Sequence, residues 1–164
     1  MVNCRSIDYM NVWRRGEARG CPYGRQETTL QDKFLIAVVD DDESMREAVK
    51  GLLRSLGYDA VAFDRAEDFL NFDRRGRVDC LIADVQMPGL TGPDLHARLV
   101  EAGQSMRTIL ITAYPDPVVR TRALRDGVKC YLTKPFRDED LHACIRSALG
   151  SDSAFTQRQS RGGA

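Results

Sequence analysis

This 164-residue chain contains five short segments typical of buried strands, and segments of helical periodicity separate them. This alternation is the feature that most limits how the chain can fold. The strands are expected at residues 34–39, 60–63, 80–83, 108–111 and 128–133. The first segment is apolar throughout and ends at Asp40, which fits a strand buried on both faces. Strict alternation of strand and helix builds a parallel sheet that helices cover on both faces. The sequence therefore predicts an α/β fold with a doubly wound, five-stranded parallel sheet.

Helices are predicted between and after these strands. The clearest begins near Met45, where apolar residues recur at helical spacing until Leu56, and Gly57 stands in the position that ends a helix. Ser44 is its expected N-cap, and the acidic residues before Ser44 suit the positive end of the helix dipole. The other helices are expected at 66–72, 93–101, 117–126 and around 141–149.

The two ends of the chain show no sustained periodicity. Residues 1–33 scatter glycine and proline among charged residues, and we expect a flexible N-terminal extension there. Residues 151–164 are expected to be a disordered C-terminal tail. A single domain is therefore predicted over 34–150.

Charge and hydropathy exclude several classes of protein. The chain carries 24 basic and 24 acidic residues, but residues 34–150 hold 16 basic and 19 acidic ones, a net charge of −3. An acidic domain suits a cation site better than the phosphate backbone of a nucleic acid. No run approaches the ~18 consecutive apolar residues of a membrane span. We therefore expect no membrane span and no direct contact with nucleic acid.

The cysteines and histidines offer no pattern typical of a metal site. The five cysteines are odd in number and form no C-x-x-C pair, so neither a disulfide framework nor a zinc site is expected. Reduced thiols in a cytoplasmic protein are the simplest interpretation. His96 and His142 lie in predicted helices without a second ligand at metal spacing, so neither is expected to bind a metal.

Polar side chains follow four of the predicted strands, at the point where each strand ends. They are Asp40 and Asp41, Asp84, Thr112 and Lys134. The carboxyl ends of parallel strands meet at one edge of the sheet, where ligands bind. Carboxylates brought together there repel one another unless a cation lies among them, and an all-oxygen ligand set suits Mg²⁺. Lysine and threonine can bind phosphate oxygens, so the simplest chemistry is attack of a carboxylate on phosphorus to give an aspartyl-phosphate.

At these residues the sequence resembles the receiver domains of two-component response regulators. The motifs that match are the pair Asp40–Asp41, Asp84 with Met87, Pro88 and Gly92, the pair Thr112–Ala113, and Tyr131 with Lys134, Pro135 and Phe136. The resemblance covers residues 34–150, and the run 111–116 is similar to receivers of the nitrogen-fixation regulator subfamily. It implies a (βα)5 flavodoxin-like fold with strand order 2-1-3-4-5.

The resemblance also implies roles for individual residues. Asp84 would be the phosphoacceptor, and Asp41 would bind Mg²⁺ directly, with Asp40 acting through water and the backbone carbonyl of Gln86 completing the site. Thr112 and Lys134 would bind the phosphoryl group. Lys134–Pro135 is expected as a cis peptide. Tyr131 would be an aromatic switch that responds to Thr112, although a simple edge-strand aromatic explains the same residue.

The resemblance implies a cytoplasmic protein that a sensor histidine kinase phosphorylates. It would catalyse only its own phosphorylation and dephosphorylation. Neither terminal segment can hold a helix-turn-helix domain, so a stand-alone receiver is expected. Its output surface would be the fourth helix, fifth strand and fifth helix, roughly 117–149, which could also form a homodimer. The bulk of Tyr114, beside the expected path of the hydrolysing water, is predicted to slow loss of the phosphoryl group.

Two other functions compete with this one. A phosphatase of the haloacid-dehalogenase type would use Asp40 as nucleophile in an Asp40-x-Asp42 motif. This sequence lacks the later acidic pair at a strand end that such a phosphatase needs, and the phosphatase hypothesis leaves Asp84 unexplained. An interaction module that has the fold without phosphorylation would have lost acidic residues that are present here.

Overall fold

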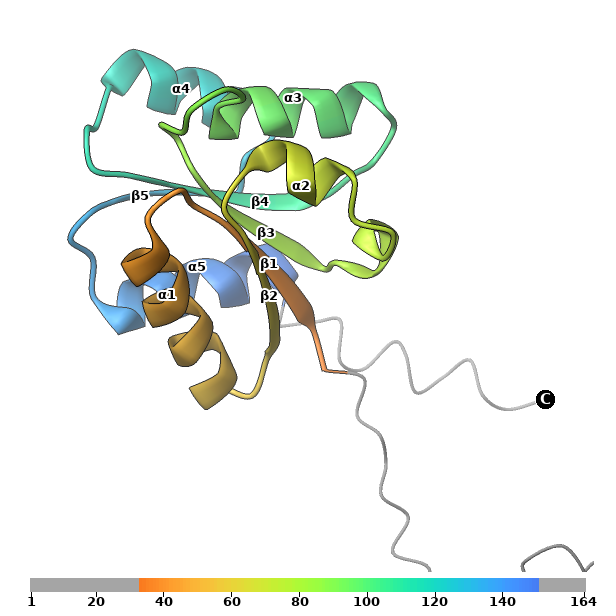
Figure 1. Ribbon diagram of the computed structural model, residues 1–164. Helices are drawn as coiled ribbons and strands as arrows, with labels where there is room; N and C mark the ends of the chain where they lie inside the picture. Colours follow the sequence, from red (N-terminus) through yellow and green to blue (C-terminus); the bar gives the residue numbers. More distant parts are fainter. Residues whose placement is uncertain (1–32, 151–164) are drawn as a thin grey trace, which may run out of the picture. The chain divides into compact units, whose positions relative to one another are not determined.

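The computed structural model describes residues 33–150, and these form a five-stranded, fully parallel sheet (Figure 1). The order across the sheet is β2-β1-β3-β4-β5, which confirms the prediction. The strands are β1 (Leu35–Val39), β2 (Asp59–Phe63), β3 (Cys80–Asp84), β4 (Arg107–Thr112) and β5 (Cys130–Thr133). The predictions for 1–33 and 151–164, apart from Lys33, lie outside the described residues.

Five helices cover the two faces of the sheet (Figure 1). Helices α1 (Glu43–Ser55) and α5 (Asp138–Leu149) lie on one face. Helices α2 (Ala66–Leu70), α3 (Gly92–Glu101) and α4 (Pro117–Arg125) lie on the other face. The structure also contains a one-turn 3₁₀ helix, Arg75–Arg77, which was not predicted. No helix among residues 33–150 is both long enough and apolar enough to cross a membrane.

Alternating side chains of the strands feed two separate cores. In β1, Ile36 and Val38 pack with Leu53 of α1 and Ile145 of α5. Ala37 and Val39 join the cluster on the opposite face. Each strand interior is thus covered on both sides, which explains why the β1 segment is apolar without alternation.

The cap of α1 differs from the prediction. The N-cap is Asp42, not Ser44: the Asp42 Oδ1 atom accepts hydrogen bonds from the backbone N–H groups of Ser44, at 2.8 Å, and Met45, at 3.2 Å. The prediction was wrong because the helix begins two residues earlier, at Glu43, and the carboxylate of Asp42 satisfies two free amides. At the other end Gly57 has φ 87°, as expected of a residue that ends a helix.

Strand β5 begins at Cys130 rather than at residue 128. The backbone N–H of Val128 donates to the carbonyl of Ala123 at 3.0 Å, so Val128 closes the end of α4. Gly127 precedes it with φ 106°, a conformation that glycine adopts without strain. Val128 therefore belongs to the turn that ends the helix, and Lys129, whose N–H donates to the carbonyl of Thr108 in β4 at 2.8 Å, leads into the strand.

Cys130 of β5 and Cys144 of α5 form a disulfide, which contradicts the expectation that the described cysteines are reduced. Their Cα atoms are 5.8 Å apart, within the usual range for disulfides. An odd cysteine count and a separation of 14 residues gave no sign of the pairing, because only the packing of α5 on the sheet brings the two sulfurs together. Cys80 remains a free thiol, and burial raises its pKa to about 12.

We predict that the disulfide adds measurably to stability. Closing a loop of this length removes conformational entropy from the unfolded chain and contributes about 3 kcal/mol, a shift of the melting temperature on the order of 10 °C. Reductant should therefore lower the melting temperature of the wild type and leave Cys144→Ser unchanged. The control Cys80→Ala should keep the sensitivity to reductant. Two alkylatable thiols at these positions in unreduced protein would contradict the pairing.

Candidate functional site

The predicted site residues lie at the carboxyl edge of the sheet. Asp40 directly follows β1, Asp84 ends β3, and Lys134 directly follows β5. The Lys134 Nζ atom donates to Asp40 Oδ2 and to Asp84 Oδ2, each at 2.8 Å. The ends of three strands, separated in sequence by 94 and 50 residues, are thus joined through one ammonium group.

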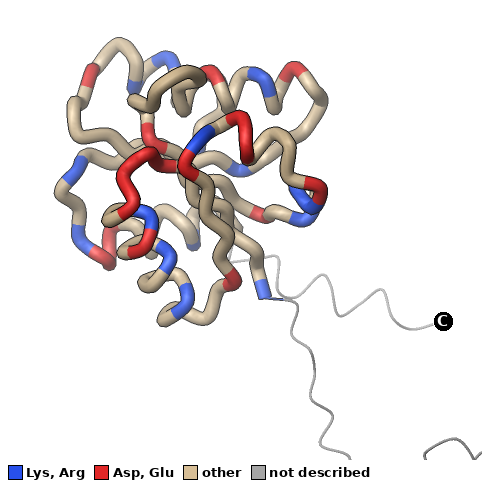
Figure 2. The backbone as a smooth tube through the Cα atoms, in the orientation of Figure 1, with Lys and Arg blue, Asp and Glu red and all other residues tan. Residues whose placement is uncertain are grey.

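Three carboxylates lie close enough together to share a cation. Asp40, Asp41 and Asp84 each offer an oxygen, and these oxygens all lie within 4.8 Å of one another. Asp40 is 2% exposed and Asp84 8%, whereas Asp41 is exposed to solvent. Figure 2 shows the acidic stretch Asp40–Glu43 as a continuous band at this end of the sheet. Two buried oxygens beside an exposed one fit Mg²⁺, which binds few carboxylates and keeps several waters.

Burial and hydrogen bonding shift the pKa values of Asp40 and Lys134. Burial raises the pKa of Asp40, and hydrogen bonds from Lys134 and from the backbone of Asp42 offset this only in part. Burial by itself would lower the pKa of Lys134, but its hydrogen bonds with Asp40 and Asp84 outweigh burial and raise the pKa above its usual value. Lys134 therefore stays charged, while the charge of Asp40 is costly.

The loop after β3 places Gln86 and Gly92 against Asp84. The backbone N–H of Gln86 donates to Asp84 Oδ1 at 3.1 Å, so both carboxylate oxygens of Asp84 are engaged. A Cβ atom at Gly92 would lie 2.3 Å from the carbonyl oxygen of Asp84. Glycine is required there for steric reasons, which gives a physical basis for its place in the motif.

Thr112 lies at the same edge but uses its hydroxyl within its own loop. The hydroxyl of this fully buried residue donates to the carbonyl of Tyr114 and accepts from its N–H, both at 3.1 Å. The Thr112 carbonyl accepts from the N–H of Lys134 at 2.7 Å. Thr112 is thus bonded to the backbone of Lys134, whereas the side chain of Lys134 contacts the carboxylates of Asp40 and Asp84.

Tyr131, the predicted switch, is half-buried on β5. Its ring packs against the core cluster beneath α2, α3 and α4. Among the described residues its hydroxyl is one of three buried polar side-chain groups without a hydrogen-bond partner. A buried hydroxyl without a partner costs free energy. The Lys134–Pro135 peptide bond that follows the strand is cis.

The family model for the response regulator receiver domain matches residues 36–146. The chain belongs to this family. It is 39% identical over 126 residues to the response regulator protein TmoT of Ectopseudomonas mendocina, covering 77% of this chain and 57% of that one. It is 35% identical to the transcriptional regulatory protein FixJ of Bradyrhizobium diazoefficiens, covering 73% and 58%. A receiver protein structure from Burkholderia phymatum matches with TM-score 0.64 and 40% identity, covering 72% and 96%.

These similarities place the carboxylate cluster within a known kind of site. Receiver domains bind Mg²⁺ at an acidic pocket and take a phosphoryl group from histidine kinases. The chain spans little more than half the length of the curated relatives it matches. The phosphatase alternative loses support as well, because Asp42, the second acid of its motif, caps α1.

One contact beside the site was not predicted from the sequence. The Arg46 Nη1 atom, on α1, donates to the backbone carbonyl of Asp40 at 2.7 Å. The only sequence signal was an arginine one turn into the helix that follows the acidic run.

We predict that Asp40→Asn changes how stability depends on pH when no divalent cation is present. Because burial raises the folded-state pKa of Asp40 above that of an ordinary aspartate, the folded protein holds this proton more tightly than the unfolded chain does. The free energy of unfolding of the wild type therefore falls as pH rises from about 4 through the folded-state pKa. Asparagine cannot ionise at this position, so the variant should lack this loss of stability with rising pH.

Thermal unfolding from pH 3 to pH 8 in EDTA measures this effect. Asp138→Asn, in the exposed first turn of α5, is the control and should follow the wild type. Parallel pH profiles for wild type and Asp40→Asn would show that Asp40 carries no such cost.

Proposed function

We propose that this domain is a phosphorylation-dependent switch that accepts a phosphoryl group on Asp84 from a sensor histidine kinase in the cytoplasm. The observation that carries the proposal is the contact of Lys134 with both Asp40 and Asp84 beside the exposed Asp41. Such a group combines a carboxylate nucleophile, an oxygen ligand set for a cation and a fixed positive charge. Phosphoryl transfer depends almost entirely on positioning and on electrostatic stabilisation.

The residues of the site divide the reaction between them. An Asp84 oxygen forms the bond to phosphorus while the bond from phosphorus to the donor histidine nitrogen breaks. The Gln86 N–H and Lys134 hold the Asp84 carboxylate in place for this attack. Asp40, Asp41, Asp84 and the carbonyl of Gln86 would hold Mg²⁺, which supplies positive charge that stabilises the transferring group.

Phosphorylation changes the hydrogen bonding of the β4–α4 loop. The new group adds roughly −1.5 to −2 charges beside Lys134. The Thr112 hydroxyl exchanges its bond to the Tyr114 carbonyl for a bond to a phosphoryl oxygen, and Tyr131 moves into the space this opens. The equilibrium between the two conformations shifts only by the difference in their affinity for the phosphoryl group.

Helix α4 is suited to transmit the change. Ala123 is its only buried residue, and Val118 is 76% exposed, so few contacts resist its movement. The proposed output surface is α4, β5 and α5, where a partner protein or a second copy of the chain would bind. Its basic side chains include Arg120, Arg122, Arg125 and Arg137.

The nature of the output depends on what accompanies the receiver domain. The relatives are longer than this chain, and FixJ is named a transcriptional regulatory protein. A DNA-binding output would come from a segment other than residues 33–150, whose elements are those of the receiver fold. The stand-alone receiver expected from sequence stays a prediction.

Intact mass after incubation with acetyl phosphate and Mg²⁺ tests the function directly. We expect a single phosphate adduct on the wild type and on the control Asp138→Asn, and none on Asp84→Asn or in EDTA. An adduct that persists on Asp84→Asn would overturn the assignment of the phosphoacceptor. Absence of an adduct on the wild type, together with an unchanged NMR spectrum after addition of beryllofluoride, would overturn the switch. Turnover of a small phosphate ester would favour the phosphatase.

We also predict that Tyr114 sets the lifetime of the phosphoryl group. Its side chain is 70% exposed, while its backbone is held by the Thr112 hydroxyl at the edge of the site. The ring can therefore shield the bond from water without being part of the core. Tyr114→Ala should lose the adduct severalfold faster than wild type, and Tyr114→Phe should match wild type. An unchanged or longer lifetime in Tyr114→Ala would contradict this role.

A further inference from the structure

The hydrogen bond from Arg46 to the Asp40 backbone lies directly beside the proposed cation site. We infer that Arg46 is a positioning residue, which holds the backbone at Asp40 so that the carboxylates of Asp40 and Asp41 face Asp84. This inference rests on the proposed Mg²⁺ site. Arg46 touches no reacting atom and binds no ligand in this scheme, since its partner is a backbone carbonyl.

Asp40 is held by four hydrogen bonds, and Arg46 makes the shortest of them. The Asp40 N–H donates to the carbonyl of Phe63 at 3.2 Å, and the Asp40 carboxylate accepts from the Asp42 N–H at 2.9 Å and from Lys134 at 2.8 Å. The guanidinium of Arg46 donates to the Asp40 carbonyl at 2.7 Å. It is the only side chain among residues 33–150 that bonds the main chain of Asp40.

The turn that Arg46 holds is under electrostatic stress. Four acidic residues follow one another from Asp40 to Glu43, and their mutual repulsion tends to open the turn. A charge-assisted hydrogen bond is stronger than a neutral one and keeps its geometry better. Arg46 lies one turn into α1, so it connects the rigid helix to the end of β1 across this acidic turn.

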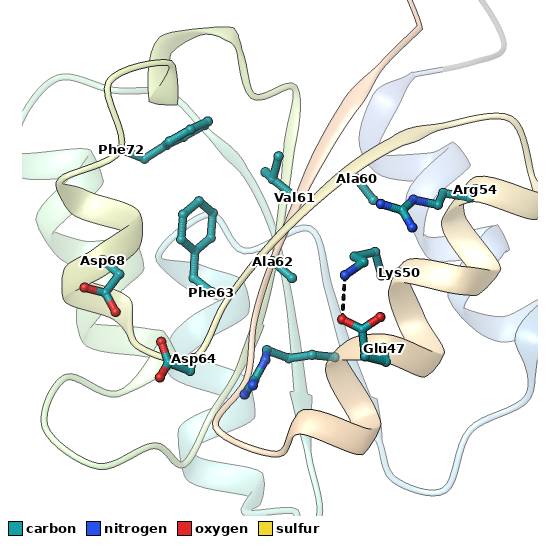
Figure 3. Close-up of a pocket in the computed structure, with 11 residues that line it drawn as sticks. Glu47, Lys50, Arg54, Ala60, Val61, Ala62, Phe63, Asp64, Asp68 and Phe72 are labelled. Atoms are coloured by element: carbon teal, nitrogen blue, oxygen red, sulfur yellow. Dashed lines mark hydrogen bonds and ion pairs between the residues drawn. The ribbon is translucent and has the colours of Figure 1, made fainter.

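The rest of α1 supplies a matched control. Arg46, Lys50 and Arg54 are spaced four residues apart and line one open cavity of about 600 Å³ between α1, β2 and α2. Figure 3 shows Lys50 directed at Glu47, with Arg54 farther along the helix, near Ala60. Arg54 shares the residue type, the helix face and the cavity with Arg46, but it lies about 12 Å farther along the helix axis.

The direction in which Mg²⁺ affinity changes when Arg46 is replaced distinguishes a positioning role from a purely electrostatic one. Removing a positive charge near a cation site strengthens Mg²⁺ binding if the arginine acts only through its charge. Loss of a residue that orients a ligand weakens binding instead, typically by about tenfold. A structural role in α1 alone would lower thermal stability and leave the affinity of the folded protein for Mg²⁺ unchanged.

Calorimetric titration of the full chain with Mg²⁺ distinguishes these roles. We expect Arg46→Met, which keeps the aliphatic stem, to bind Mg²⁺ about tenfold more weakly than wild type. Arg46→Lys should recover part of the affinity, and Arg54→Met should bind as well as wild type or slightly better. In acetyl phosphate reactions the Mg²⁺ concentration at half-maximal rate should rise for Arg46→Met, with the rate at saturating Mg²⁺ unchanged.

Each outcome decides a separate point. Equal or tighter Mg²⁺ binding by folded Arg46→Met, or equal weakening in Arg54→Met, would overturn the positioning role while leaving the proposed function intact. Failure of the wild type to bind Mg²⁺ would instead overturn the proposed site itself. Melting temperatures in EDTA establish that each variant is folded; if Arg46→Met does not fold, full wild-type affinity in Arg46→Lys would overturn the requirement for the guanidinium.

Discussion

The ammonium group of Lys134, placed between the carboxylates of Asp40 and Asp84, is the interaction on which the functional end of this domain depends. Two buried carboxylates at neighbouring strand ends would repel each other without a positive charge. In the strand order β2-β1-β3-β4-β5, β5 neighbours neither β1 nor β3, so the lysine side chain must reach across the end of β4. The last residue of β4 is Thr112, which places its hydroxyl beside this crossing.

The two cores of the sheet make this arrangement possible. Apolar side chains fill both faces along the strands, so polar groups are confined to the strand ends, where no helix covers them. The loops at that edge are short and held by specific contacts: Asp42 caps α1, Gly92 allows the backbone to approach Asp84, and Arg46 bonds Asp40. These contacts fix the backbone at the edge where the carboxylates meet.

Strand β5 connects the carboxylate site to the proposed output surface. The strand holds Cys130, which is joined to α5, and Tyr131, whose hydroxyl has no hydrogen-bond partner among residues 33–150. Lys134, which contacts the carboxylates, directly follows it. A change at Asp84, the proposed phosphoacceptor, that alters Lys134 would act at the end of the strand that packs against the proposed output helices. The disulfide ties this strand to α5, so movement of β5 and α5 as a unit is favoured over separation of the two.

The sequence by itself determined the alternation of strands and helices, because each element follows from local hydrophobic periodicity, and it determined which polar residues meet, because the ends of parallel strands share one edge. It also pointed to the family, since the motifs lie at those ends. Tertiary structure alone decided the features that depend on contacts between distant groups. Cys130 and Cys144 pair only when α5 packs on the sheet, and Arg46 reaches the Asp40 carbonyl only with α1 placed beside the end of β1. The cap of α1, by contrast, is a local choice between Asp42 and Ser44, which hydrophobic periodicity does not decide. Periodicity records which face of an element is buried, but it does not record which side chains from different elements come within bonding distance.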